Sequence, residues 1–302
     1  MNFVTVQHNL DTLVGLVNPE ETKVLLLNPA EEVRSGQRSF PSSLVECISA
    51  GQSFIDQVNS LLDWVNQSED TNVYYMPIDK VTLLSPIPRP NKNIFCVGKN
   101  YAEHVIEMGS AADIPKHVMV FTKAPTTVIG PNEQVLNHQN VTNQLDYEGE
   151  LAVIIGKKGR AIKKEEALDY IFGYTILNDV TARDLQARHK QFFIGKSLDT
   201  TCPMGPWIVH KSAIDNPNKL HIETRVNGEV RQSSNTENFI FLIEDVISVL
   251  SAGMTLEPGD IIATGTPAGV GKGFNPPKFL QPGDQIEITI EKIGTLRNTI
   301  KE

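Results

Sequence analysis

The sequence predicts an α+β protein with a small N-terminal α+β unit and a larger β-rich domain. Helix-spaced apolar residues are concentrated before residue 66, and short Val- and Ile-rich runs dominate after residue 94. Between them, the proline-rich segment 85–90 can continue neither a helix nor a central strand. A chain of 302 residues also suits one large domain with a small one. We therefore expect domains at residues 1–85 and 86–302.

The N-terminal unit is predicted to alternate strands and helices. Residues 3–7 and 23–27 read as short strands separated by polar, turn-like sequence. Residues 44–48 and 54–65 carry apolar side chains at helical spacing.

The second domain is predicted to be mainly strands. Thr236 is expected to cap one helix, which extends to Leu250. The Asn-Gly pair at 227–228 predicts a hairpin. Two Pro-Gly-Asp turns, at 257–260 and 281–284, look like equivalent hairpin turns of a β-roll. The predicted strands are 94–97, 118–122, 146–156, 174–179, 207–209, 285–292 and 295–300.

Composition excludes several classes of partner. A net charge of −9 argues against nucleic acid. Residues 1–6 lack the pattern of a signal peptide, and no apolar run approaches the ~20 residues that cross a bilayer. The three cysteines form no Cys-x-x-Cys pair, as expected for reduced thiols. We expect a cytoplasmic protein without membrane insertion.

Three carboxylates stand on two predicted neighbouring strands. Glu148 and Glu150 are two apart, so in a strand they point to the same face, and Asp179 ends the next acid-bearing strand. Such an all-oxygen set suits Mg²⁺ or Mn²⁺. Without a cation, repulsion should keep one acid protonated. The alternative is that the two glutamates face solvent.

A helical segment and two loops add further candidates. If residues 101–108 are helical, His104 and Glu107 share a face and form an acid–base pair; otherwise such a pair is surface decoration. The loop 264–267 offers Gly265 and Thr266 as backbone and hydroxyl donors. The Gly-rich run 269–273 lacks the spacing of a nucleotide-binding loop, and no Gly-x-Ser-x-Gly motif is present.

Five motifs in order resemble the fumarylacetoacetate hydrolase family over roughly residues 90–300. They are residues 98–104, 146–156, 178–184, 195–197 and 264–271. The resemblance implies a β-rich catalytic domain of mixed β-roll or sandwich type, and a divalent metal on the three acids. It also implies a small keto acid as substrate and a homodimer joined through the catalytic domains.

The resemblance implies roles for single residues. His104 and Glu107 match the dyad of a lid helix, and Lys196 matches a lysine that faces the substrate carboxylate or enolate. Arg183 and Gln186 match positions that hold substrate oxygens, although Arg183 has the alternative of bracing the acids. Lys123 is similarly placed for substrate binding.

The dyad and the pattern Thr-Ala-Arg-Asp-x-Gln at 181–186 are most similar to family members that decarboxylate oxaloacetate. Decarboxylation to pyruvate and CO₂ through an enolate is therefore the favoured function. Hydrolysis of acylpyruvates or fumarylpyruvate uses the same enolate as leaving group and is the alternative. A third reading is a partner-binding scaffold that keeps the fold.

Overall fold

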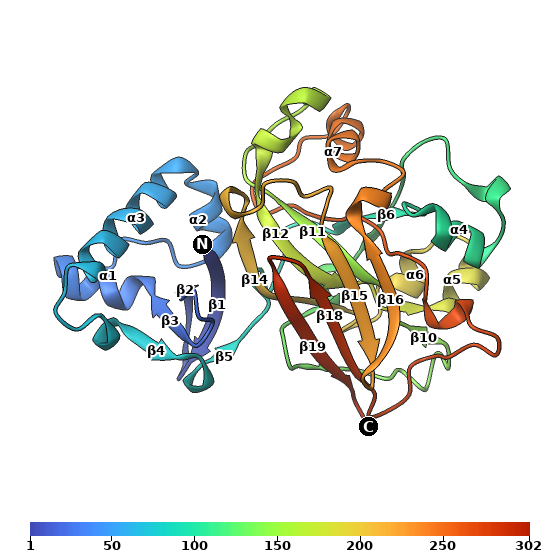
Figure 1. Ribbon diagram of the computed structural model, residues 1–302, viewed down its shortest axis with the longest axis horizontal. Helices are drawn as coiled ribbons and strands as arrows, with labels where there is room; N and C mark the ends of the chain where they lie inside the picture. Colours follow the sequence, from blue (N-terminus) through green and yellow to red (C-terminus); the bar gives the residue numbers. More distant parts are fainter.

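One twelve-stranded sheet runs through the whole molecule, as the computed structural model of residues 1–302 shows (Figure 1). Its main path is β4-β3-β2-β1-β14-β12-β11-β17-β6-β7, with β5 paired to β1 and β8 to β14. Its strands are β1 (Asn2–His8), β2 (Asp11–Val17), β3 (Lys23–Leu26), β4 (Tyr75–Pro77), β5 (Thr82–Leu83), β6 (Ile94–Gly98), β7 (Met119–Lys123), β8 (Val128–Ile129), β11 (Gly149–Ile155), β12 (Ile171–Asn178), β14 (Cys202–His210) and β17 (Ile261–Ala263).

A five-stranded sheet, in the order β16-β15-β18-β19-β9, packs against β11 and β12 to form a sandwich (Figure 1). Its strands are β9 (Gln134–Val135), β15 (His221–Val226), β16 (Glu229–Asn235), β18 (Gln285–Ile290) and β19 (Gly294–Ile300). A short pair joins β10 (Leu145–Asp146) to β13 (Thr181–Ala182). The sheets are open and do not close into a barrel. The predicted α+β class with a β-rich part is confirmed.

Strand β11 is buried on both faces, which explains its unbroken apolar sequence. Leu151 and Val153 belong to the core between the two sheets. Ala152 and Ile154 point the other way, into a second core that the N-terminal helices share. The strand that carries the acids is therefore held from both sides.

Helices cover the outer faces and the ends of the large sheet (Figure 1). None of them combines the length and the apolar composition that a bilayer-spanning segment requires. They are α1 (Leu27–Ser35), α2 (Leu44–Ser49), α3 (Gln52–Asn66), α4 (Ala102–Met108), α5 (Arg183–His189), α6 (Phe193–Lys196) and α7 (Ile243–Ser251), with short 3₁₀ segments between them.

The helix predicted for 236–250 begins later, at Ile243. The Thr236 hydroxyl accepts a hydrogen bond from the Leu220 amide and donates one to Pro217 O, so it closes a loop and does not cap the helix. The Asp245 carboxylate accepts the Leu242 amide instead. The two Pro-Gly-Asp turns do precede strands, but β17 and β18 lie in different sheets, so the turns are not equivalent.

The N-terminal part shares both a sheet and a core with the rest of the chain. Strand β1 pairs with β14, with Phe3 opposite Ile208. The Phe3 ring lies 5.2 Å from that of Phe54 in α3 and 5.4 Å from that of Phe172 in β12. The large sheet thus crosses the predicted boundary at residue 85, and the two parts are rigidly joined.

We predict that Phe3→Ala destabilises the whole protein, because this fully buried ring packs against aromatic rings of both parts. Truncating a buried phenylalanine costs about 3–5 kcal/mol. Denaturant unfolding should show one earlier transition, and Leu10→Ala, at a position 97% exposed, should leave it unchanged. An early transition limited to the N-terminal part would show that the two parts unfold separately.

Candidate metal centre and active site

Three carboxylates converge where β11 begins and β12 ends. Antiparallel pairing sets Gly149 opposite Asn178, which brings Glu148 and Glu150 beside Asp179. One oxygen from each of the three lies within 4.8 Å of the others, and all three residues are buried. The alternative that the glutamates face solvent is therefore wrong.

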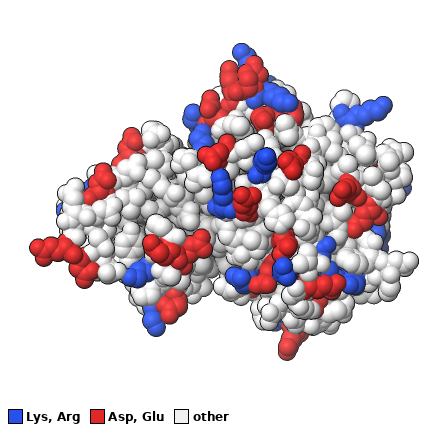
Figure 2. Space-filling view, in the orientation of Figure 1, with Lys and Arg blue, Asp and Glu red and all other residues white.

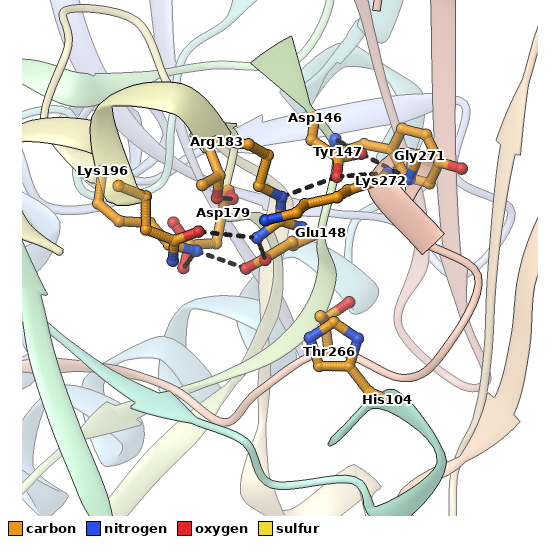
Figure 3. A network of polar contacts seen from close by, with 12 residues as sticks. His104, Asp146, Tyr147, Glu148, Asp179, Arg183, Lys196, Thr266, Gly271 and Lys272 are labelled. Carbon is orange, nitrogen blue, oxygen red and sulfur yellow. Dashed lines mark hydrogen bonds and ion pairs between the residues drawn. The ribbon is translucent and has the colours of Figure 1, made fainter. Parts of the chain in front are cut away.

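Three cations surround these acids (Figure 3). Lys196 Nζ lies 2.5 Å from Glu148 Oε2 and 2.7 Å from Asp179 Oδ2. Lys123 Nζ lies 2.8 Å from Asp179 Oδ1 and donates to Val180 O. Arg183 Nη1 lies 2.7 Å from Glu148 Oε1, while its Nε donates to Asp146 Oδ2 at 2.8 Å. Arg183 thus braces the acids, one of the two roles open from the sequence.

The cluster has one more carboxylate than it has cations, and Glu150 is the carboxylate without an ion-pair partner. Four carboxylates, counting Asp146, face three cations, and Glu150 accepts only the Gly265 amide, at 2.7 Å. Burial raises the pKa of Glu150 well above its usual range, and Asp179 and Glu148 raise it further. Burial also raises the pKa of Glu148, but Lys196 and Arg183 outweigh it and hold that pKa below its ordinary value.

These residues fit a divalent cation. The donors are carboxylate oxygens only, which hard ions such as Mg²⁺ and Mn²⁺ prefer. A buried cluster with one carboxylate too many is also the environment that a positive ion stabilises. Glu148, Glu150 and Asp179 would hold such an ion.

Asp146 connects the cluster to a glycine-rich loop (Figure 3). Besides Arg183 Nε, its carboxylate accepts the backbone amides of Gly271 at 2.6 Å and Lys272 at 3.0 Å. The neighbouring Tyr147 hydroxyl donates to Gly269 O at 2.7 Å. Residues 269–272 are therefore fastened to the strand end that carries the acids.

The same loop holds the helix that bears the predicted dyad. His104 Nδ1 lies 3.3 Å from Glu107 Oε2, as their spacing on α4 requires. Glu107 Oε1 accepts the Gly269 amide at 2.9 Å, and a Cβ at Gly273 would lie 2.2 Å from that oxygen. A side chain at 273 would therefore displace the Glu107 carboxylate from this position.

A cavity of about 310 Å³ lies between α4, α5 and the acids. Its wall includes the following predicted site residues: His104, Glu148, Glu150, Arg183, Gln186, Lys196 and Thr266. Lys123 is fully buried behind Asp179 and does not reach the cavity. The Gly265 amide is directed at Glu150. Lys123 and Gly265 thus contact the acids, and the substrate contacts expected of them stay a prediction.

Several residues of the site were not predicted from the sequence. Asp146 stands two residues before Glu148, so the same alternation that paired the glutamates could have indicated it. Lys99, Lys190 and Lys272 line the cavity from three different segments, and no spacing rule relates them. Buried Gln232 donates to Thr266 Oγ1 and accepts the Gly149 amide, a bridge between sheets that only the fold creates.

Residues 93–301 match the family described as fumarylacetoacetate (FAA) hydrolase, C-terminal. The chain belongs to this family. The match covers well over half of the 302 residues and includes every predicted site residue. The resemblance drawn from the five motifs is confirmed.

Full-length relatives support the membership. The chain is 57% identical to the oxaloacetate tautomerase YisK of Bacillus subtilis, over 99% of this chain and 100% of that protein. A fumarylacetoacetate hydrolase structure from Exiguobacterium antarcticum is 42% identical with a TM-score of 0.82, covering 100% and 99% of the two chains. A maleylpyruvate hydrolase from Sphingobium sp. SYK-6, in complex with manganese(II) and pyruvate, is 27% identical with a TM-score of 0.77, covering 100% and 99%.

We predict that Glu150→Gln abolishes Mn²⁺ binding and flattens the pH dependence of stability in the metal-free protein. In wild type the folded state retains a proton above the ordinary pKa of 4.5 that the unfolded chain releases. The stability from that proton is lost as pH rises from 4.5 to the raised value, and glutamine removes the effect.

Thermal unfolding in the presence of a chelator, from about pH 5 to about pH 8, compares the stability of wild type and Glu150→Gln. Glu103→Gln, at an exposed position, is the control. Titration calorimetry measures Mn²⁺ binding. A Glu150→Gln variant that bound Mn²⁺ like wild type would show that the ligand assignment is wrong.

Proposed function

We propose that the protein interconverts the keto and enol forms of oxaloacetate. The observation that carries this proposal is His104, which lines the same cavity as Glu148 and Glu150 and is paired through Nδ1 with Glu107. Tautomerisation moves a proton between C3 and the C2 oxygen, so it needs a positioned acid–base group next to a site that tolerates an enolate. The tautomerase named for the 57% identical relative supports this choice over other family reactions.

Mg²⁺ or Mn²⁺ held by Glu148, Glu150 and Asp179 would supply a Lewis acid that stabilises charge on the substrate oxygens. The manganese in the maleylpyruvate hydrolase structure supports a metal of this kind. Lys123 and Arg183 form ion pairs with Asp179 and Glu148 and would orient them as ligands, the function of groups behind a metal ligand.

The remaining residues would bind the substrate and move the proton. Gln186 and Lys196 present hydrogen-bond donors to the substrate carboxylate and keto oxygen. His104 takes the C3 proton and returns it to the C2 oxygen, and Glu107 fixes the orientation of its ring. The Gly269 amide holds Glu107 in turn, so α4 stays over the cavity.

Decarboxylation of oxaloacetate is a second candidate, because loss of CO₂ from C4 produces an enolate in the same place. The position of Lys196 in the cavity wall favours it, since its ammonium can stabilise that enolate without any proton transfer from C3. Hydrolysis of acylpyruvates is a third reaction with the same enolate, supported by the hydrolase relatives.

We further propose that residues 86–302 form the catalytic domain of a cytoplasmic homodimer. Strand β7 is an open edge of the large sheet, and apolar Val120, Phe193 and Ile194 are exposed beside it, where a second copy could cover them.

The three cysteines are buried free thiols, as expected in a reducing compartment. On the face in Figure 2, acidic and basic side chains are mixed without a basic patch, which supports a small molecule over nucleic acid as partner. An intact ligand set and dyad speak against a scaffold alone.

The function is tested by adding metal-loaded protein to freshly dissolved enol-oxaloacetate. We expect the ultraviolet absorbance of the enol to fall faster than in buffer, with pyruvate formed much more slowly. Pyruvate formed as fast as the enol disappears would identify a decarboxylase. No acceleration of either process would refute both reactions.

We predict that His104→Ala and Glu107→Ala each lower turnover about 10²–10⁴-fold while Mn²⁺ binding persists, because neither residue is a metal ligand. The double variant should be little worse than the poorer single one, since the pair acts as one unit. Glu103→Ala, exposed on the same helix, serves as control. Full turnover by His104→Ala would leave the dyad without a catalytic role.

A further inference from the structure

Three lysines that line the cavity form no ion pair. Lys196 and Arg183, at its inner end, are paired with Glu148, Asp179 and Asp146. Lys99, Lys190 and Lys272 line the same cavity, and none has a carboxylate within the 4.0 Å of an ion pair. The cavity wall therefore carries two cations paired with carboxylates and three lysines that have no ion-pair partner.

The backbone at Lys272 is held by hydrogen bonds to the acid cluster. Its backbone amide and that of Gly271 both donate to Asp146, whose other contact is Arg183. From the anchored loop its side chain extends toward the part of the cavity where Arg183 and Glu148 lie (Figure 3). One carboxylate thus sets the position of the paired arginine and of the unpaired lysine.

The loop around Lys272 also has a fixed relation to the dyad. The neighbouring Gly273 lies against the Glu107 carboxylate, with no space for a side chain, and Gly269 donates to the same group. The loop that contains Lys272 therefore contacts both Asp146 of the acid cluster and Glu107 of α4. A substrate bound in the cavity that these segments border lies in the field of the Lys272 ammonium.

Lys99 and Lys190 reach the cavity from two other directions. Lys99 directly follows β6, and Lys190 directly follows α5, the helix that carries Arg183 and Gln186. Both have left-handed backbone conformations, with φ of 57° and 58°. A like-charged group of this kind is stabilised by an anion from solution, and it attracts one into the cavity.

We propose that Lys272, with Lys99 and Lys190, forms a second anion subsite that binds the carboxylate at the far end of the substrate. The protein then selects four-carbon dicarboxylates over monocarboxylates that share the same 2-oxo or 2-hydroxy acid head. The proposal deepens the proposed function, because oxaloacetate carries this second carboxylate at C4. Selectivity of this kind is a difference between two affinities, so it is measured with two ligands.

Binding of malate and of lactate tests the subsite independently of the reaction. Both carry a 2-hydroxy acid head, only malate has the distal carboxylate, and neither has the keto group that the proposed reaction requires. Calorimetry with Mn²⁺-loaded wild type should give tighter binding of malate. In Lys272→Met the affinity for malate should fall about tenfold, as for the loss of one charge contact, with that for lactate unchanged.

Two further variants control for charge and fold. Lys272→Arg keeps the positive charge and should retain most of the preference for malate. Lys278→Met removes a lysine from the same loop that pairs with Glu229 outside the cavity, and it should change neither affinity. Equal loss of malate and lactate binding in Lys272→Met, or no loss of either, would overturn the subsite, as would equal affinities in wild type.

The same measurements distinguish this subsite from the proposed reaction. If wild type does not turn over oxaloacetate but Lys272→Met still loses malate selectively, the reaction is wrong and the subsite stands. If wild type turns over oxaloacetate and the ratio of malate to lactate affinity is unchanged in Lys272→Met, the reaction stands and the subsite is wrong.

Discussion

The structure depends on a buried cluster in which four carboxylates are met by only three cations. Glu148, Glu150, Asp179 and Asp146 lie in the interior with Lys123, Arg183 and Lys196. Isolated charges at such depth are very unfavourable, and removing one partner of a buried pair typically costs about 3–5 kcal/mol. Lys123 comes from β7, Arg183 from α5 and Lys196 from α6, and the loop at Gly265 donates a backbone amide to Glu150. The positions of these four segments therefore depend on this cluster.

The cluster also positions the chemistry around it. Asp146 holds the loop 269–272, the loop holds Glu107, and Glu107 orients His104. His104 and Glu107 are therefore connected to the carboxylate cluster through backbone amides, which have no rotamer freedom to lose. This arrangement satisfies the requirement for a pre-organised site, in which the supporting contacts keep catalytic groups within a fraction of an ångström.

Periodicity and turn chemistry predicted most elements, because β11, α3 and the Asn-Gly hairpin each follow a single local rule. Strand β2 and helix α1 were among the elements that the sequence did not predict. Gly15 weakens the strand pattern of β2, and it is there because a Cβ would lie 2.5 Å from Val24. Pro29 interrupts the helical pattern of α1. The pairing of Glu148 with Glu150 was predictable from alternation on one strand, and Asp179 from the end of the next acid-bearing strand. The contacts of Lys123 and Gly265 with those acids were not, since they depend on which distant segments the sheet brings together.

We propose that Glu148, Glu150 and Asp179 form one site for a divalent cation, which would displace Lys196 from these acids. Diffraction from Mn²⁺-soaked crystals, with anomalous data at the manganese edge, would locate the ion. We expect a single strong peak bounded by the three carboxylates, with Lys196 Nζ moved away from Glu148 and Asp179 to face the cavity. A peak elsewhere, or Lys196 still bridging the two acids with no manganese between them, would contradict it.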